Sequence, residues 1–344
     1  MSRGRKRKKN TFWWKVLLFI LILIAAAIFL GRSQEEKAKE TVWQDGSMLR
    51  IGDLQVDARE GMVYLDAVQA DYEQYYGSDI WNYVVDSQGN TMEEVIKDQT
   101  LEQIIYVKVV CKKADELGIV LSEEELQQVD EQTASYMEKI KDSNLLLYGV
   151  NADIVRRIYS DNLLARKTFE TTTLNVNTDI SDEEAAQKRF YTMAIRNYKI
   201  DSSGARVSYE GNELEELKSR VASLRQQALE TTDFYKLAAA NTEDATMLEI
   251  TGGPGDFPAL YEEAVLALKT GEVSEVFETT DYYYIFYCVT EFDVDATYAK
   301  KEEIIAARQE EEFQTRYQEW RGLTHIEVNE EVWNALTFDM DAVG

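Results

Sequence analysis

Residues 261–289 read YEEAVLALKTGEVSEVFETTDYYYIFYCV, and they decide the fold of the C-terminal half of the chain. Apolar spacing predicts a helix over residues 259–268, which Gly271 ends because glycine readily takes the left-handed backbone conformation found after helices. Alternating large residues then predict two strands, over residues 273–277 and 282–289. The stretch is therefore a helix followed by two strands that can pair.

The preceding segment predicts the rest of a compact unit. A strand is predicted within residues 189–200, an amphipathic helix over residues 212–229 and a short helix over residues 234–240. The run GGPG at residues 252–255 is the most turn-rich in the chain. The order strand, helix, helix, helix, strand, strand defines an α+β unit of about a hundred residues.

The first half of the chain is mostly helical. Ser122 with Glu125 has the spacing of a capping box, Gly118 is the natural stop for the helix before it, and Asn151 or Asp153 can open the next helix. A strand pair is expected over residues 49–56, and the helices are expected over residues 61–76, 91–117, 122–141, 151–169 and, near the C-terminus, 298–320.

The motifs of the C-terminal half resemble those of a parvulin domain. The matching features are Tyr261-Glu262-Glu263-Ala264, then the run LKTGEVS at residues 268–274, then the strand that begins at Asp281. Upstream, FYKLA at residues 234–238 is similar to the family's short helix, and Gly252-Gly253 to its glycine pair.

The helical half is similar to the N-terminal segment of extracytoplasmic foldases of the PrsA and SurA type. The resemblance rests on the run LGIVLSEEE at residues 117–125, on LLAR at residues 163–166 and on ISDEE at residues 180–184. In those proteins a parvulin domain is inserted between this segment and a final helix that packs back on it. The resemblance implies an α+β fold divided as follows: a basic tail and transmembrane anchor at 1–32, a linker at 33–48, a helical chaperone domain at 49–188, a parvulin-like domain at 189–293 and a C-terminal helix and tail at 294–344.

The parvulin resemblance implies peptidyl-prolyl cis/trans isomerisation, which needs no cofactor or metal. Family members hold the proline ring among apolar residues, beside a polar core of two histidines and an Asp or Cys. In this sequence Asp244 falls on the Asp/Cys position, Tyr261 on the pocket Phe and Phe257 on the pocket Met, while Tyr284 stands where the last strand has a histidine. Asp244 and Tyr284 are thus candidate catalytic residues, and Phe257 and Tyr261 candidate substrate-binding residues.

Two departures from the family pattern put isomerase activity in question. The first histidine is expected near Arg196 or Asn197, yet the chain has one histidine in all, His325. In addition, seven residues separate Gly253 from Tyr261, where the family usually has about thirteen, so the wall of the proline pocket is shortened.

Some features have plain structural interpretations. Asp244 can be only a helix cap, Tyr283 is expected in the core, and Tyr284 can be either core or site. His325 is expected to be structural or exposed, and Cys111 and Cys288 to be buried thiols in different domains. Two cysteines and one histidine cannot supply the usual ligands of a zinc site.

Charge and hydropathy indicate the compartment. Residues 1–32 carry a local charge of +8, and the remaining 29 basic and 63 acidic residues give −34, so nucleic acid is a poor partner. Residues 12–31 are apolar apart from Lys15 and can span a bilayer as a helix of about 30 Å. The basic residues before them place the N-terminus in the cytoplasm. A cleaved signal peptide, with Ala25 and Ala27 before the cut, is the alternative, and it also places the acidic part outside the cytoplasm.

Three functions remain open on the sequence alone. The first is a membrane-anchored extracytoplasmic foldase or chaperone, whose degenerate parvulin domain binds unfolded or proline-containing polypeptides. The second is an active peptidyl-prolyl isomerase that works without the family histidines. The third is a non-catalytic docking protein at the membrane.

Overall fold

The computed structural model describes residues 43–141 and 143–338 of the 344-residue chain. They divide into two compact units. The helical unit extends to Leu174 and resumes at Phe313, and the sheet unit comprises Asn175–Glu312. Helix α11 (Val294–Leu323) runs from the second unit into the first, so residues from both ends of the sequence build the helical unit.

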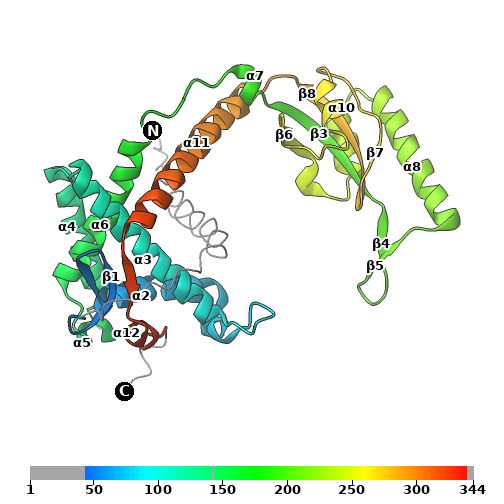
Figure 1. The fold of residues 1–344 in the computed structure, drawn as a ribbon. Coiled ribbons are helices and arrows are strands. Elements are labelled where there is room, and N and C mark those ends of the chain that lie inside the picture. The colour runs from blue at the N-terminus through cyan, green and yellow to red at the C-terminus, as the bar shows by residue number, and fades with distance from the viewer. Residues whose placement is uncertain (1–42, 142, 339–344) are drawn as a thin grey trace, which may run out of the picture. The chain divides into compact units, whose positions relative to one another are not determined.

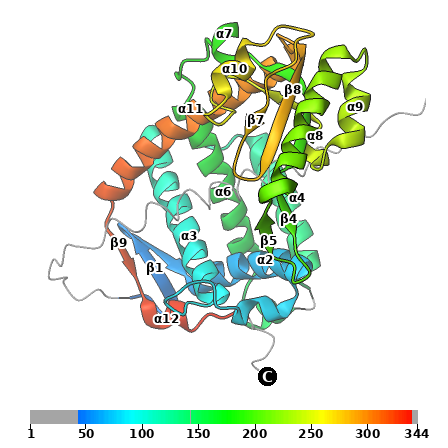
Figure 2. The same ribbon diagram turned by 90° about the vertical axis from the view of Figure 1, so that its right-hand side faces the viewer.

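The helical unit contains a three-stranded sheet of order β2-β1-β9. Its strands are β1 (Ser47–Ile51), β2 (Leu54–Asp57) and β9 (Ile326–Val328). Figure 2 shows β9 beside β1, where Leu49 pairs with Val328 and Ile51 with Ile326 in antiparallel register. The C-terminal segment therefore adds a strand to the sheet of the N-terminal unit. β1 begins inside the stretch that the sequence assigns to the linker.

The other elements of this unit are helices, and their predicted caps are confirmed. Ser122 forms the capping box with Glu125, Asn151 accepts from the first backbone N–H groups of its helix, and Gly118 ends the preceding helix at φ 69°. The helices are α2 (Ala58–Tyr76), η2 (Ser78–Asn82), α3 (Met92–Leu117), α4 (Glu123–Lys139), α5 (Asn144–Leu147), α6 (Ala152–Thr172) and α12 (Glu330–Asn334).

A buried ion cluster crosses the core of the helical unit. Lys108 on α3 is 3% exposed and donates to Glu60 on α2 at 2.5 Å and to Asp161 on α6 at 2.6 Å. Burial alone would lower the pKa of Lys108, but the carboxylates of Asp161 and Glu60 outweigh it and raise that pKa. The cluster thus ties three helices together through one ammonium group.

The sheet unit is built on a four-stranded antiparallel sheet of order β6-β3-β8-β7. Helices α8 (Gly211–Glu230) and α9 (Phe234–Asn241) pack on one face, and α10 (Glu262–Ala267) packs on the other (Figure 1). The strands are β3 (Lys188–Arg196), β6 (Glu249–Gly252), β7 (Phe277–Glu278) and β8 (Tyr282–Thr290), and short α7 (Asp182–Ala185) and η3 (Ala245–Met247) complete the unit.

Four details of the sheet unit differ from the sequence-based expectation. The strand expected within residues 189–200 ends at Arg196, and a separate hairpin of β4 (Tyr198–Ile200) and β5 (Arg206–Ser208) follows it. Strand β6 was not expected. The strand expected over residues 273–277 is reduced to β7 and one bridge, and the helix expected over residues 259–268 begins only at Glu262.

No helix within residues 43–141 and 143–338 has both the length and the apolar character that a bilayer crossing requires. The span predicted over residues 12–31 lies outside the described residues.

Candidate functional site

Three of the four candidate residues meet in one aromatic cluster on the α10 face of the sheet. The ring of Tyr261 lies 6.1 Å from that of Tyr284 and 6.5 Å from that of Phe257, centroid to centroid. Buried Phe286 holds them from the sheet side, at 5.6 Å from Tyr261 and 6.1 Å from Phe257. Period-two alternation along β8 explains the placement, since Tyr284 and Phe286 point to this face while Tyr283 points to the other.

The strand register shows what faces Tyr284. Its direct cross-strand partner on β3 is Ala194, and Arg196 pairs with Tyr282 two residues away. Burial, together with neighbouring Tyr261, Tyr282 and carboxylates, raises the pKa of Tyr284 to about 12. The phenol is therefore a neutral hydroxyl at physiological pH, next to a methyl group.

Asp244, the fourth candidate, lies just before η3. Its carboxylate caps that turn, accepting from the Thr246 N–H at 3.0 Å and from the Thr246 hydroxyl at 2.6 Å. Its charge is also close enough to contribute to the raised pKa of Tyr284. Asp244 thus both caps a turn and borders the cluster.

The shortened loop packs Phe257 tightly against the sheet. The ring stands edge-to-face on Phe190 at 5.7 Å, and it covers Gly252 so closely that a Cβ there would meet the ring at 2.5 Å. Asp256 fixes the turn by accepting from the Gly253 N–H at 2.8 Å and from Gln187 at 3.1 Å. The loop is therefore held by specific contacts, and a side chain at position 252 would require the Phe257 ring to shift.

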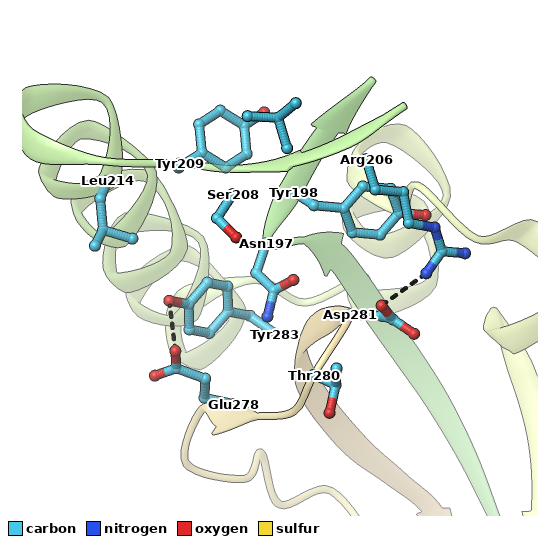
Figure 3. A pocket seen from close by; sticks show the side chains of 11 residues that line it. Asn197, Tyr198, Arg206, Ser208, Tyr209, Leu214, Glu278, Thr280, Asp281 and Tyr283 are labelled. Carbon is cyan, nitrogen blue, oxygen red and sulfur yellow. Dashed lines mark hydrogen bonds and ion pairs between the residues drawn. The ribbon is translucent and has the colours of Figure 1, made fainter. Parts of the chain in front are cut away.

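A pocket of about 320 Å³ lies beside the cluster, between the β4–β5 hairpin and the turn that joins β7 to β8 (Figure 3). None of the four candidate residues lines it. An ion pair from Arg206 to Asp281, 2.9 Å long, closes one side, and Tyr283 donates to Glu278 at 3.1 Å on another. Sequence reasoning missed this pocket because it missed the hairpin that forms its wall.

Tyrosine rings connect the pocket to the cluster. Tyr198 at the pocket stands edge-on to Tyr282 at 6.4 Å, and Tyr282 lies 5.7 Å from Tyr284. The chain of contacts then reaches Tyr261. An aromatic track therefore extends from the pocket into the candidate site.

The remaining sequence candidates lie apart from this track. The His325 side chain is 66% exposed and lies 3.6 Å from Glu327, as a surface residue. Cys288 is buried in the sheet unit, but Cys111 in the helical unit is only half-buried, which corrects the expectation for it. Over the described residues no three His, Cys, Asp or Glu side chains are grouped as metal ligands would be.

The cluster is an apolar group of rings bordered by one phenol, that of Tyr284, and one carboxylate, that of Asp244. An antiparallel sheet of order β6-β3-β8-β7, two helices on one face and the Gly-Glu-Val-Ser turn before the last strands define a parvulin-type domain. The helical unit, completed by the end of α11 and by β9, is the second part of the protein.

Comparison with known proteins agrees with this class. A model of the SurA-like N-terminal domain matches residues 2–144, and a model of the PPIC-type PPIase domain matches residues 205–290. The protein named foldase protein PrsA of Clostridium botulinum strain Langeland is 24% identical over 321 residues, 87% of this chain and 91% of that one. The foldase protein PrsA of Caldanaerobacter subterraneus is 22% identical over 215 residues, 61% of each chain.

Among solved structures, foldase protein PrsA from Streptococcus pneumoniae aligns with 73% of this chain and 97% of its own, at 16% identity and a TM-score of 0.35. The chain belongs to the PrsA- and SurA-like parvulin family, with the domain composition of a foldase that carries a PPIase domain.

Proposed function

We propose that the protein is an extracytoplasmic foldase, anchored to the membrane by its N-terminal segment, that binds unfolded or newly exported polypeptides. Its similarity to proteins named foldase protein PrsA along 87% of the chain supports the foldase function. The basic run within residues 3–9, followed by the apolar residues 12–31, supports the anchor and its orientation.

We further propose that the sheet unit is chiefly a proline-binding module. One observation carries this: the residue across the sheet from Tyr284 is Ala194, so neither position supplies an imidazole to the polar core that the family uses. Rotation about a peptide bond has a barrier of about 18–20 kcal/mol, and lowering it requires stabilising the twisted amide more than the planar one. The rings of Phe257 and Tyr261 contact the proline ring, and they therefore bind the planar and the twisted amide equally well.

An active isomerase is the second candidate, and the position of Asp244 near Tyr284 favours it. The raised pKa keeps the Tyr284 phenol protonated, so it can donate a hydrogen bond to an amide carbonyl oxygen. No bond is broken in the isomerisation, so proton transfer is not required in principle.

NMR exchange spectroscopy on a series of proline peptides separates the two candidates. With the fragment of residues 33–344 added, a binding module shifts the peptide resonances without raising the cis/trans exchange rate. An active isomerase raises that rate, and Asp244→Ala and Tyr284→Phe lower it again. Val120→Ser, at an exposed site of the helical unit, is the matched control.

Aggregation assays test the foldase itself. The fragment should suppress the aggregation of several unrelated unfolded proteins at stoichiometric amounts. Failure with every client, together with no binding of proline peptides, would contradict the proposed function.

A further inference from the structure

The helical unit has an unusual apolar surface where α2 ends. Tyr75 is 76% exposed, Tyr76 67% and Tyr83 64%, and exposed Val84 and Val85 follow directly. We call these five residues the tyrosine patch. Soluble proteins rarely leave several large apolar side chains exposed on one short segment, and where they do the surface is often a binding site.

The patch lies on a firm base. Half-buried Tyr72 has its ring 6.1 Å from that of Tyr76 and 5.7 Å from that of Trp81. Trp81 is 7% exposed, stacks on Phe338 at 4.0 Å and donates to Glu73 at 2.7 Å. The exposed rings of Tyr75 and Tyr76 therefore extend from a packed aromatic core, which lowers the entropy that binding would cost.

The second half of the patch is held by a short hairpin between η2 and α3, in the light blue to cyan segment of Figure 1. Val84 bridges Thr91 in antiparallel fashion, and the Met92 N–H donates to the Tyr83 carbonyl at 2.8 Å. A capping box at Thr91 then begins α3. The backbone that presents Tyr83 and Val84 is thus fixed at both ends.

The segment that carries the patch is acidic. Residues 66–94 contain seven carboxylates and neither Lys nor Arg. Within the described residues no salt bridge joins any of the seven to a Lys or Arg side chain. Asp71 on α2 and Asp79 on η2 are both exposed, within a few residues of Tyr75, Tyr76 and Tyr83 in the chain. The surface therefore attracts cations and repels anions.

We propose that the tyrosine patch binds extended, positively charged segments of unfolded polypeptides. The proposal rests on the proposed foldase function and names the class of client that this surface selects. Lys and Arg side chains are attracted to the faces of tyrosine rings, and the carboxylates around the patch strengthen that attraction. The same carboxylates disfavour anionic lipid, nucleic acid and a second copy of this acidic chain.

Fluorescence anisotropy with labelled peptides tests the proposal on the full-length protein. Two peptides share the same apolar residues, one with Lys and Arg between them and one with Asp and Glu. We expect the basic peptide to bind at least tenfold more tightly, and its affinity to fall as salt rises from about 50 to 500 mM. Equal affinity for the two peptides would overturn the proposal.

Two variants locate the site. The triple variant Tyr75→Ser, Tyr76→Ser and Tyr83→Ser should bind the basic peptide at least tenfold more weakly. The control variant, Leu147→Ser with Val120→Ser, removes side chains that are 83% and 71% exposed elsewhere on the same unit, and it should bind that peptide as tightly as the wild type does. Asp71→Asn with Asp79→Asn leaves the tyrosines intact and should reduce both the affinity and its salt dependence.

The outcomes also separate this proposal from the proposed function. If the tyrosine variant binds the basic peptide as the wild type does, while the protein still suppresses client aggregation, the patch is not the site and the foldase function stands. If the wild-type protein binds neither peptide and protects no client, both are overturned.

Discussion

Removing the Lys108 ammonium group should be among the most damaging single changes in the helical unit. Lys108→Met retains an unbranched apolar chain of similar length and deletes the charge. Glu60, 2% exposed, then keeps only Arg157, 3.3 Å away on a side chain 49% exposed, and Asp161 loses its partner at 2.6 Å. Breaking a buried ion pair from one side costs about 3–5 kcal/mol.

Removing the Glu60 carboxylate should reduce the stability of the unit by less. Glu60→Met leaves Lys108 with Asp161, whose side chain is 22% exposed and partly hydrated. We therefore expect about 1–3 kcal/mol for Glu60→Met, the range for a partly satisfied buried group. The double variant should be more stable than Lys108→Met alone, because it buries no uncompensated carboxylate at position 60.

In the fragment of residues 33–344, which lacks Trp13 and Trp14, tryptophan fluorescence reports on this unit alone. Residues 175–312 contain no tryptophan, whereas Trp81, Trp320 and Trp333 are buried in the helical unit. With a urea m-value of about 2 kcal/mol/M, the expected loss moves the unfolding midpoint of Lys108→Met down by about 1.5–2.5 M. Lys112→Met on the same helix removes an ammonium group that is 46% exposed and should cost under about 0.5 kcal/mol.

A midpoint shift for Lys108→Met no larger than that for Lys112→Met would refute the reasoning. So would a double variant that is less stable than Lys108→Met, since the cost would then come from lost packing and not from an unpaired charge.

Three further predictions concern the sheet unit. Any isomerase activity should be independent of pH between about pH 6 and pH 10, because no histidine lies in this unit and the pKa of Tyr284 is raised to about 12. An inflection near pH 6.5 in the cis/trans exchange rate measured by NMR would contradict this. Asp256→Asn should remove part of the loss of stability that acid causes. Burial raises the pKa of Asp256, but hydrogen bonds from Gly253 and Gln187 and contact with Lys300 outweigh burial and lower that pKa. The Asp256 carboxylate therefore stabilises the fold above its unfolded pKa, and this contribution is lost as pH falls through its folded pKa. Acid unfolding followed by circular dichroism checks this. Gly253→Ala should destabilise the unit by more than about 2 kcal/mol in thermal unfolding, because the new Cβ would lie 2.1 Å from the backbone oxygen of Ala186. Gly255→Ala is the comparison, since its Cβ would meet open space and the variant tests only the positive φ of that residue.

The helix boundaries of the helical unit could be predicted because their signals are local. Ser122, Asn151 and Gly118 act through hydrogen bonds or backbone conformation within one turn of their own position. The ion cluster at Lys108 could not be predicted, since its three helices come together only in the folded unit. A lysine within an apolar helix face is the one signal that could have suggested it.

The strands of the sheet unit were harder to place. The run from Arg189 to Ile200 has strand composition throughout, and only the pairing shows that β3 stops at Arg196. The Asp201 side chain turns the chain by accepting from the Ser203 and Ala205 N–H groups, so residues 198–200 pair with β5 and not with β8. The pocket follows from this local competition, and the pattern of apolar residues does not reveal it.

The position opposite Tyr284 shows what a motif alone can establish. The sequence places the missing histidine near Arg196 or Asn197, whereas the register places Ala194 across from Tyr284. Arg196 lies on the same face of β3 as Ala194, because side chains alternate with a period of two, but it pairs with Tyr282 and not with Tyr284. A motif can therefore identify the face of a strand on which a site is built. Whether two groups on neighbouring strands touch depends on the register, and here the register puts a methyl group beside the phenol that the proposed site would use.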